Sequence, residues 1–315
     1  MASSAAPMLG LRAIGITVRE MDKTLRWYRS SLRLRELRRF AVPAAEFGPD
    51  LLTAQTGTVE IVVAEAATGI MQFMAFSDGP PPRPTPLGVL GPGYTHLCLQ
   101  SPAADPALPK LMAAGMSLVS RCDERGVDLG GYGIRYAYGH DPEGRMIEVE
   151  VLDRPQRSET AWLCHLANVV HDHPGMMSFY TRLFGMDPRN TAEQGGRPTF
   201  DAVAGIDGVA IRGAWFNPGG LELEVWHFTH PPAPVPASRR RLDEIGYNAP
   251  MFEVVQLDAA VARLADVGAT PVGPVMDLGG WKTRYAADPE GNLFALQQAV
   301  SAPLDETVQA FVAAG

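Results

Sequence analysis

Segments of apolar residues recur along the chain, and each one precedes a stretch with apolar positions at helical spacing. The apolar segments cover residues 13–18, 93–99, 165–170 and 246–252. The stretches that follow them include residues 25–28, 111–115, 177–180 and 264–268. A short apolar run followed by a 3.6-residue periodicity predicts a strand that leads into an amphipathic helix. Three short segments rich in Val, Ile, Leu, Phe and Tyr then predict further strands in each unit. The pattern therefore predicts four units, modules one to four.

One turn phrase occurs twice. Residues 141–144, Asp-Pro-Glu-Gly, precede a strand that reads Met146-Ile147-Glu148, and residues 288–291 repeat the phrase before Leu293-Phe294-Ala295. Asp, Pro and Gly favour a tight turn because Pro fixes φ and Gly accepts a positive φ. The second copy keeps the turn residues but has Ala295 in place of the carboxylate. We therefore expect the turn to be structural and Glu148 to be available for chemistry.

Pro-rich and polar stretches mark the boundaries between modules. Residues 78–92 and 229–236 separate the first module from the second in each half, and residues 152–159 join the halves. We therefore expect an N-terminal half at 1–152 and a C-terminal half at 153–315. With 46% hydrophobic residues in 315, the chain has enough material for two globular domains.

Taken together, these motifs resemble those of one superfamily. They are His-hydrophobic-x-hydrophobic at the start of a module, Phe-Tyr with a downstream Gly on the helix, and Asp-Pro-x-Gly before Ile-Glu. Over about residues 10–299 the chain resembles the vicinal oxygen chelate superfamily, which includes glyoxalase I, bleomycin-resistance proteins and extradiol dioxygenases. The resemblance implies an α+β fold in which four βαβββ modules form two curled mixed-sheet cups. It also implies metal ligands at fixed positions on the first and fourth strands of each module.

Those positions differ sharply between modules. They are occupied by Ala13 and Gln72 in module one, His96 and Glu148 in module two, His165 and Glu224 in module three, and Ala249 and Ala295 in module four. The separations from 13 to 72 and from 165 to 224 are both 59 residues, which supports this alignment. Glu222 is the competing assignment, because it lies two residues before Glu224 and on the same face of the strand.

Two pairings of the modules are open. Pairing in chain order would place His96 and Glu148 in one cup with Ala13 and Gln72, and would separate them from His165. Pairing module two with module three, over residues 93–228 and within one chain or between chains, would collect one complete ligand set: His96, Glu148, His165 and Glu224. We favour the second pairing. Two imidazoles and two carboxylates suit one divalent ion such as Ni²⁺, Co²⁺, Fe²⁺, Mn²⁺ or Zn²⁺.

Further side chains share the faces of these ligands. Tyr138 lies ten residues before Glu148 and resembles a tyrosine that assists some extradiol dioxygenases. Tyr285 is placed equivalently beside Ala295, so a packing role for Tyr138 is at least as consistent with the sequence. Trp226 shares the face of Glu224, and Cys98 shares the face of His96.

Composition limits the partners. A formal net charge of −8 with no extended basic region argues against general nucleic-acid binding. Three cysteines without metal-type spacing fit a reducing cytoplasm, and no apolar run approaches the length of a membrane span. We expect a small-molecule substrate, no nucleic acid or membrane partner, and either a monomer or a homodimer.

Three functions remain open at this point. The first is a glyoxalase- or epimerase-like lyase or isomerase, in which the metal stabilises an enolate or enediolate and Glu148 or Glu224 moves the proton. The second is an Fe²⁺ extradiol-type dioxygenase using His96, His165 and Glu148. Residues 129–131, however, hold no histidine where that family commonly has a catalytic one. The third is a metal-free protein that sequesters a ligand.

Overall fold

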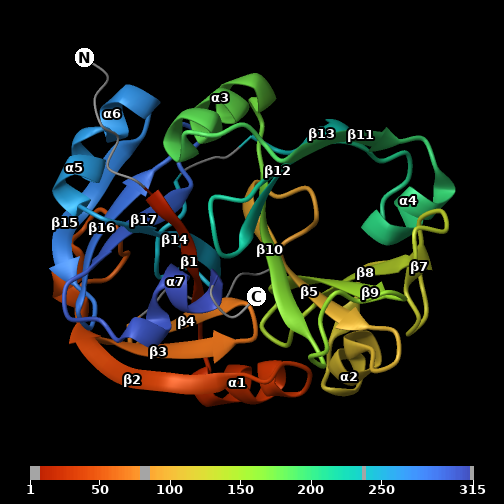
Figure 1. Ribbon diagram of the computed structural model, residues 1–315, viewed down its shortest axis with the longest axis horizontal. Helices are drawn as coiled ribbons and strands as arrows, with labels where there is room; N and C mark the ends of the chain where they lie inside the picture. Colours follow the sequence, from red (N-terminus) through yellow and green to blue (C-terminus); the bar gives the residue numbers. More distant parts are fainter. Residues whose placement is uncertain (1–7, 79–85, 236–238, 313–315) are drawn as a thin grey trace.

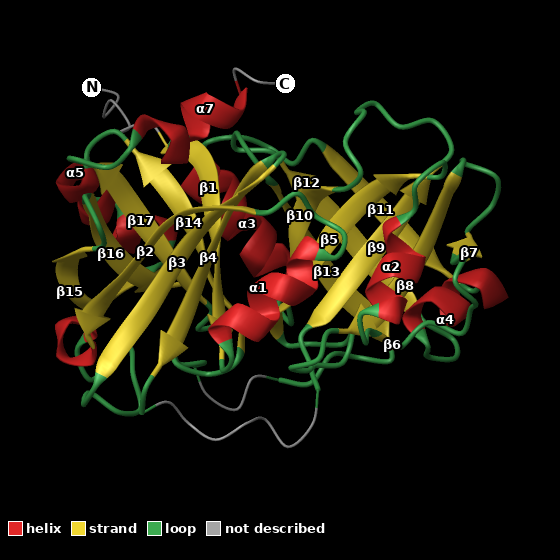
Figure 2. Ribbon diagram, turned by 90° about the horizontal axis from the view of Figure 1, so that it is seen from below, coloured by secondary structure: helices red, strands yellow, loops and turns green. Residues whose placement is uncertain are grey.

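The fold combines two strongly curled mixed sheets with short helices. The computed structural model describes residues 8–78, 86–235 and 239–312. The two sheets lie side by side, and each curls into a half-barrel (Figures 1 and 2). The predicted α+β class with two cups is therefore confirmed. The Pro-rich joints at 78–92 and 229–236 lie partly outside the described residues.

The first sheet contains the strands of modules one and four. Its order is β15-β16-β17-β14-β1-β4-β3-β2. The strands are β1 (Met8–Val18), β2 (Arg35–Pro43), β3 (Thr58–Ala66), β4 (Gly69–Phe76), β14 (Gly246–Val254), β15 (Thr270–Asp277), β16 (Trp281–Ala287) and β17 (Leu293–Ala299).

The second sheet contains the strands of modules two and three. Its order is β11-β12-β13-β10-β5-β9-β8-β6, and β7 pairs with β8 beside this path. The strands are β5 (Gly93–Pro102), β6 (Ser117–Leu118), β7 (Val127–Asp128), β8 (Ile134–His140), β9 (Met146–Leu152), β10 (Trp162–Val169), β11 (Asn190–Gly195), β12 (Ala210–Phe216) and β13 (Glu222–His230).

This topology places the first strands of two modules at the centre of each sheet. In the second sheet β5 and β10 pair antiparallel, β5 pairs parallel with β9, and β10 pairs parallel with β13. Four neighbouring strands, in the order β13-β10-β5-β9, thus carry the four ligand positions of modules two and three. Module two therefore pairs with module three, and it does so within one chain. This is the second of the two pairings considered above.

The helices mostly cover the outer faces of the sheets, but Pro198–Ala204 lines the cavity of the second sheet and Val308–Val312 packs against β1 and the core of the first. They are α1 (Met21–Arg29), α2 (Ala107–Ala113), α3 (His173–Phe184), α4 (Pro198–Ala204), α5 (Leu257–Ala262), α6 (Leu264–Val267) and α7 (Val308–Val312), with 3-10 turns η1 (Ala44–Phe47) and η2 (Leu304–Glu306). Helices α1 and α3 lie between the two sheets (Figure 2). Their buried Tyr28 and Phe179 belong to one apolar core that includes Ile14 of β1 and Leu166 of β10. The two sheets therefore share a core.

Local sequence explains where α3 begins and ends. Asp172 accepts a hydrogen bond from the backbone N–H of Gly175 (3.2 Å), and Pro174 occupies the first turn, where no N–H partner is needed. Gly185 ends the helix at φ 69°, a left-handed conformation that glycine adopts without strain.

Both copies of the Asp-Pro-Glu-Gly phrase form the same turn. Asp141 accepts hydrogen bonds from the backbone of Glu143 and Arg145, each at 2.9 Å. Asp288 accepts them from the backbone of Glu290 (2.9 Å) and Asn292 (2.8 Å). The glycines that follow, Gly144 and Gly291, have φ of 82° and 85°. The turn is thus structural in both modules, as the repeat indicates.

Candidate metal centre

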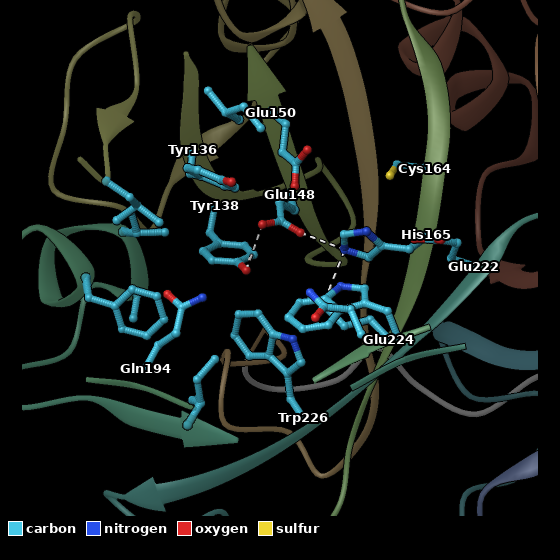
Figure 3. Close-up of a pocket in the computed structure, with 18 of the residues that line it drawn as sticks. Tyr136, Tyr138, Glu148, Glu150, Cys164, His165, Gln194, Glu222, Glu224 and Trp226 are labelled. Carbon is cyan, nitrogen blue, oxygen red and sulfur yellow. Dashed lines mark hydrogen bonds and ion pairs between the residues drawn. The ribbon is translucent and has the colours of Figure 1, made fainter. Parts of the chain in front are cut away.

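Four side chains from four adjacent strands converge on the concave face of the second sheet. His165 Nε2 lies 2.9 Å from Glu148 Oε2 and 3.1 Å from Glu224 Oε2. His96 Nε2 lies 3.3 Å and 3.5 Å from the same two oxygen atoms. One ligand atom from each residue lies within 4.8 Å of all the others. The close-up shows Glu148, His165 and Glu224 directed toward a common point (Figure 3). The structure thus brings together the four residues that the sequence singled out.

The four side chains are buried and electrostatically coupled. Their exposed fractions are 0% for His96, 3% for Glu148, 3% for His165 and 2% for Glu224. Burial by itself lowers the pKa of a histidine and raises that of a carboxyl group. Here the mutual hydrogen bonds and charges outweigh burial, so the pKa of each histidine is raised and the pKa of each glutamate is lowered. Without a metal, the cluster therefore favours protonated imidazoles beside ionised carboxylates.

Two buried polar atoms of the cluster lack a well-directed hydrogen bond, which is consistent with a role in binding a cation. His96 Nε2 and Glu224 Oε2 are buried and have no well-directed hydrogen-bond partner among the described residues. The other ring nitrogen of His96, Nδ1, lies 3.0 Å from the Thr95 hydroxyl, which orients the ring with Nε2 toward the cluster. Unpaired buried polar atoms are costly, and a divalent ion bound by two nitrogen and two oxygen atoms would satisfy both. The residues present fit such an ion.

Tyr138 contacts the cluster directly. It lies on β8 opposite Glu148 on β9, and its hydroxyl donates a hydrogen bond to Glu148 Oε1 (3.0 Å). Burial, together with the charge of Glu148, raises the pKa of Tyr138 well above its usual value. The phenol therefore stays protonated, so that one oxygen of Glu148 is held by Tyr138 while the other faces the histidines.

The equivalent positions of the first sheet hold no such cluster. Ala13, Ala249 and Ala295 are buried in an apolar core. Gln72 accepts a hydrogen bond from the buried Arg12 (3.2 Å), whose guanidinium also donates to Gln297 (2.6 Å). Tyr285, the counterpart of Tyr138, has no hydrogen-bond partner for its hydroxyl among the described residues. The cup of the first sheet is thus filled by the side chains of the protein itself.

A cavity of about 370 Å³ opens next to the cluster. Glu148, His165 and Glu224 form part of its wall, and Trp226 lies on the same face as Glu224 (Figure 3). The rest of the wall has an apolar part, which includes Phe200 and Val203 of α4, Ile211 and Phe228, and a polar part, which includes Gln100, Glu150, Asn190 and Gln194. The site therefore has room for a small molecule beside the proposed ligands.

Helix α4 closes one side of this cavity. It is a part of module three but is bonded to the loop that follows β6 in module two. The Ser120 hydroxyl donates to Val203 O, and the backbone N–H of Arg121 donates to Ala202 O (2.8 Å). The apolar part of the cavity wall thus depends on contacts between two modules.

Sequence reasoning missed two residues next to the cluster. Glu150 follows Glu148 by two positions on β9 and lines the same cavity, so strand alternation could have indicated it. Cys164, beside His165, lies within 4.8 Å of Cys98 and of the His165 ring. A hydrogen bond with Cys98 outweighs burial and lowers the pKa of Cys164 to about 6. No local sequence signal indicated that contact, because it depends on the pairing of β5 with β10.

Glu222, the competing assignment, lies outside the cluster. Its carboxylate pairs with Arg189 at 2.8 Å and 3.2 Å, and Arg189 is largely exposed. Exposed ion pairs of this kind contribute about 0–1 kcal/mol to the stability of the folded protein. We therefore expect Glu222→Gln to leave metal affinity nearly unchanged, as measured by titration with a competing chromophoric chelator. Loss of metal binding in Glu222→Gln, with retention in Glu224→Gln, would show that the wrong carboxylate has been assigned.

Comparisons with known proteins are consistent with this architecture. A profile of the Glyoxalase/Bleomycin resistance protein/Dioxygenase superfamily matches residues 10–149 and 162–296. The chain belongs to this superfamily. The two matched stretches correspond to the two halves of the chain, each with two modules.

Solved structures show the same fold. Glyoxalase I from Zea mays is similar with a TM-score of 0.60 and 16% identity, over 93% of this chain and 92% of that chain. A putative dioxygenase from Bacillus subtilis subsp. subtilis str. 168 is similar with a TM-score of 0.57 and 12% identity, over 98% and 91%. None of the curated proteins matches the sequence significantly. Among the described residues, no helix has the length and apolar character needed to cross a membrane.

Proposed function

We propose that the protein is a divalent-metal-dependent lyase or isomerase, of glyoxalase or epimerase type, that acts on a small oxygenated carbonyl compound. The observation that supports this most is the convergence of His96, Glu148, His165 and Glu224 beside the cavity. Members of the superfamily generally bind a divalent metal. These four side chains would hold the ion, which would supply Lewis-acid stabilisation of negative charge on a substrate oxygen.

Proton transfer would fall to the carboxylates. Glu148 is held at one oxygen by Tyr138 and at the other by His165. Glu224 also faces His165, at 3.1 Å, but among the described residues it has no second hydrogen bond like the one that Tyr138 donates to Glu148. We therefore assign Glu224 as the group that accepts the proton from the carbon next to the substrate carbonyl. Glu148 and Tyr138 would keep the site in place and exclude water from this wall.

A panel of α-hydroxy and α-oxo carbonyl compounds tests this proposal. Metal-reconstituted protein should exchange the proton next to the carbonyl for deuterium in D₂O, as followed by NMR, and protein stripped of metal should not. The same preparation loaded with Fe²⁺ and given catechols should consume no oxygen. Oxygen uptake with formation of ring-cleavage products would establish a dioxygenase instead. Tight ligand binding without exchange or turnover would indicate a sequestering protein.

A further inference from the structure

Glu150 is a buried acid that the proposed metal set leaves unused. It is 8% exposed and lines the cavity from β9. Its Oε2 accepts a hydrogen bond from Gln100 Nε2 (2.7 Å), and Gln100 Oε1 in turn accepts one from Trp162 Nε1 (2.9 Å). The indole N–H is only a donor, so this chain fixes the amide nitrogen of Gln100 toward Glu150. The side chain of Glu150 is thus held in one orientation.

The second oxygen of Glu150 remains available. Among the described residues, Oε1 has no hydrogen bond and the carboxyl group has no ion-pair partner. This oxygen borders the cavity, so a bound ligand that donates a hydrogen bond can reach it.

The position of Glu150 relative to the cluster limits what it can contact. One of its oxygen atoms lies within 4.8 Å of a ligand atom of Glu148 and of His165. In Figure 3 it lies next to Glu148 at the cavity wall, near Tyr136. A substrate bound at the metal would therefore present to Glu150 the atoms directly next to its coordinating oxygen.

Glu150 could alternatively be a metal ligand, because it also groups with Cys98, Glu148 and His165. That set would use Glu148 and His165 and leave His96 Nε2 and Glu224 Oε2 buried without partners. The set with His96 and Glu224 satisfies both of those atoms, so Glu150 is left for the substrate.

We propose that Glu150 is a substrate-binding residue, whose free oxygen accepts a hydrogen bond from an O–H or N–H group next to the metal-bound oxygen of the ligand. This inference rests on the proposed metal centre and narrows its substrate class. The preferred compounds carry a hydroxyl or an N–H group on the atom beside the coordinating oxygen. Their remaining apolar part faces Phe200 and Val203 of α4.

Two matched pairs of chelating probes test the inference on Co²⁺-loaded protein. Acetohydroxamate carries an N–H group that N-methylacetohydroxamate lacks, and glycolate carries an O–H group that methoxyacetate lacks. Dissociation constants are measured from the visible spectrum of Co²⁺. The donor-bearing member of each pair can form a hydrogen bond to Glu150 that the other member cannot. The wild type should therefore bind the donor-bearing member of at least one pair about tenfold more tightly. In Glu150→Met that preference should fall to about one, with metal content and melting temperature measured alongside.

Glu222→Gln is the matched control, since Glu222 lines the same cavity but is already paired with Arg189. It should keep the wild-type preference. Three results would overturn the role of Glu150: no donor preference in the wild type, an unchanged preference in Glu150→Met, or loss of Co²⁺ from Glu150→Met, which would make Glu150 a ligand. If the wild type bound no metal, the proposed function and this inference would both fail. If metal bound but the preference did not depend on Glu150, only this inference would fail.

Discussion

Replacing Glu148 by glutamine should lower the affinity for the divalent ion by about 100-fold or more and leave the fold intact. Glu148 Oε2 lies closest to both imidazoles, at 2.9 Å from His165 Nε2 and 3.3 Å from His96 Nε2. A neutral amide is a weaker ligand and provides no charge to balance the ion. Even residues that only support a ligand cost roughly 10–100-fold when replaced, so loss of the ligand itself should cost at least as much.

Competition with a chromophoric chelator gives the affinity, and circular dichroism reports the fold. Tyr138→Phe is a milder variant for comparison, because it removes the hydrogen bond to Glu148 Oε1 but keeps the carboxylate. Its affinity should lie between those of the wild type and Glu148→Gln. A Glu148→Gln protein that binds metal within about twofold of the wild type would remove Glu148 from the ligand set.

Metal affinity should also rise steeply with pH between about 6 and 7. Protons compete with the metal, because the pKa values of His96 and His165 in the metal-free protein are raised above the usual 6.5. Below those raised values each histidine must release a proton before it can bind the ion. The affinity should therefore increase by about tenfold per pH unit for each proton displaced, and level off above the raised pKa values. The carboxylates do not contribute in this range because their pKa values are lowered.

Titration calorimetry in buffers with different ionisation enthalpies counts the released protons. His230→Asn is a suitable control, since His230 is exposed at the end of β13 and should not affect the slope. Affinity that does not change between pH 6 and 7, with no proton release, would contradict proton–metal competition at these histidines.

The local elements of the fold and the candidate site residues could be predicted from the sequence alone. The resemblance to the superfamily placed candidate ligands at His96, Glu148, His165 and Glu224, and the repeated turn, the strand alternation and the 59-residue separation in modules one and three supported that alignment. Each of these signals depends on neighbours along the chain. They could be recognised without knowing how the modules pack, because a strand directs every second side chain to one face.

The pairing of modules is a tertiary property, and the sequence left it open. It depends on whether β5 lies beside β10 or beside β1, and the sequence favours the first arrangement only because it collects one complete ligand set. The same limit applies to Glu150 and Cys164, whose significance arises from contacts across strands. It also applies to Gln72, which is a candidate position by alignment but is bonded to Arg12 in the structure. Cross-strand partners of this kind have no local pattern in the sequence.

Elemental analysis of the reconstituted protein tests the central claim most directly. The purified chain is stripped with a chelator, reloaded with Ni²⁺, Co²⁺, Mn²⁺, Fe²⁺ or Zn²⁺ in turn, and freed of excess metal. Because every candidate ligand set among the described residues includes His165, only one set can be used at a time, and about one ion per chain should remain. His96→Ala and His165→Ala should each reduce that value, although they lie in different halves of the chain. Two ions per chain, no retained ion with any of the metals, or full retention in both histidine variants would contradict a single centre built from modules two and three.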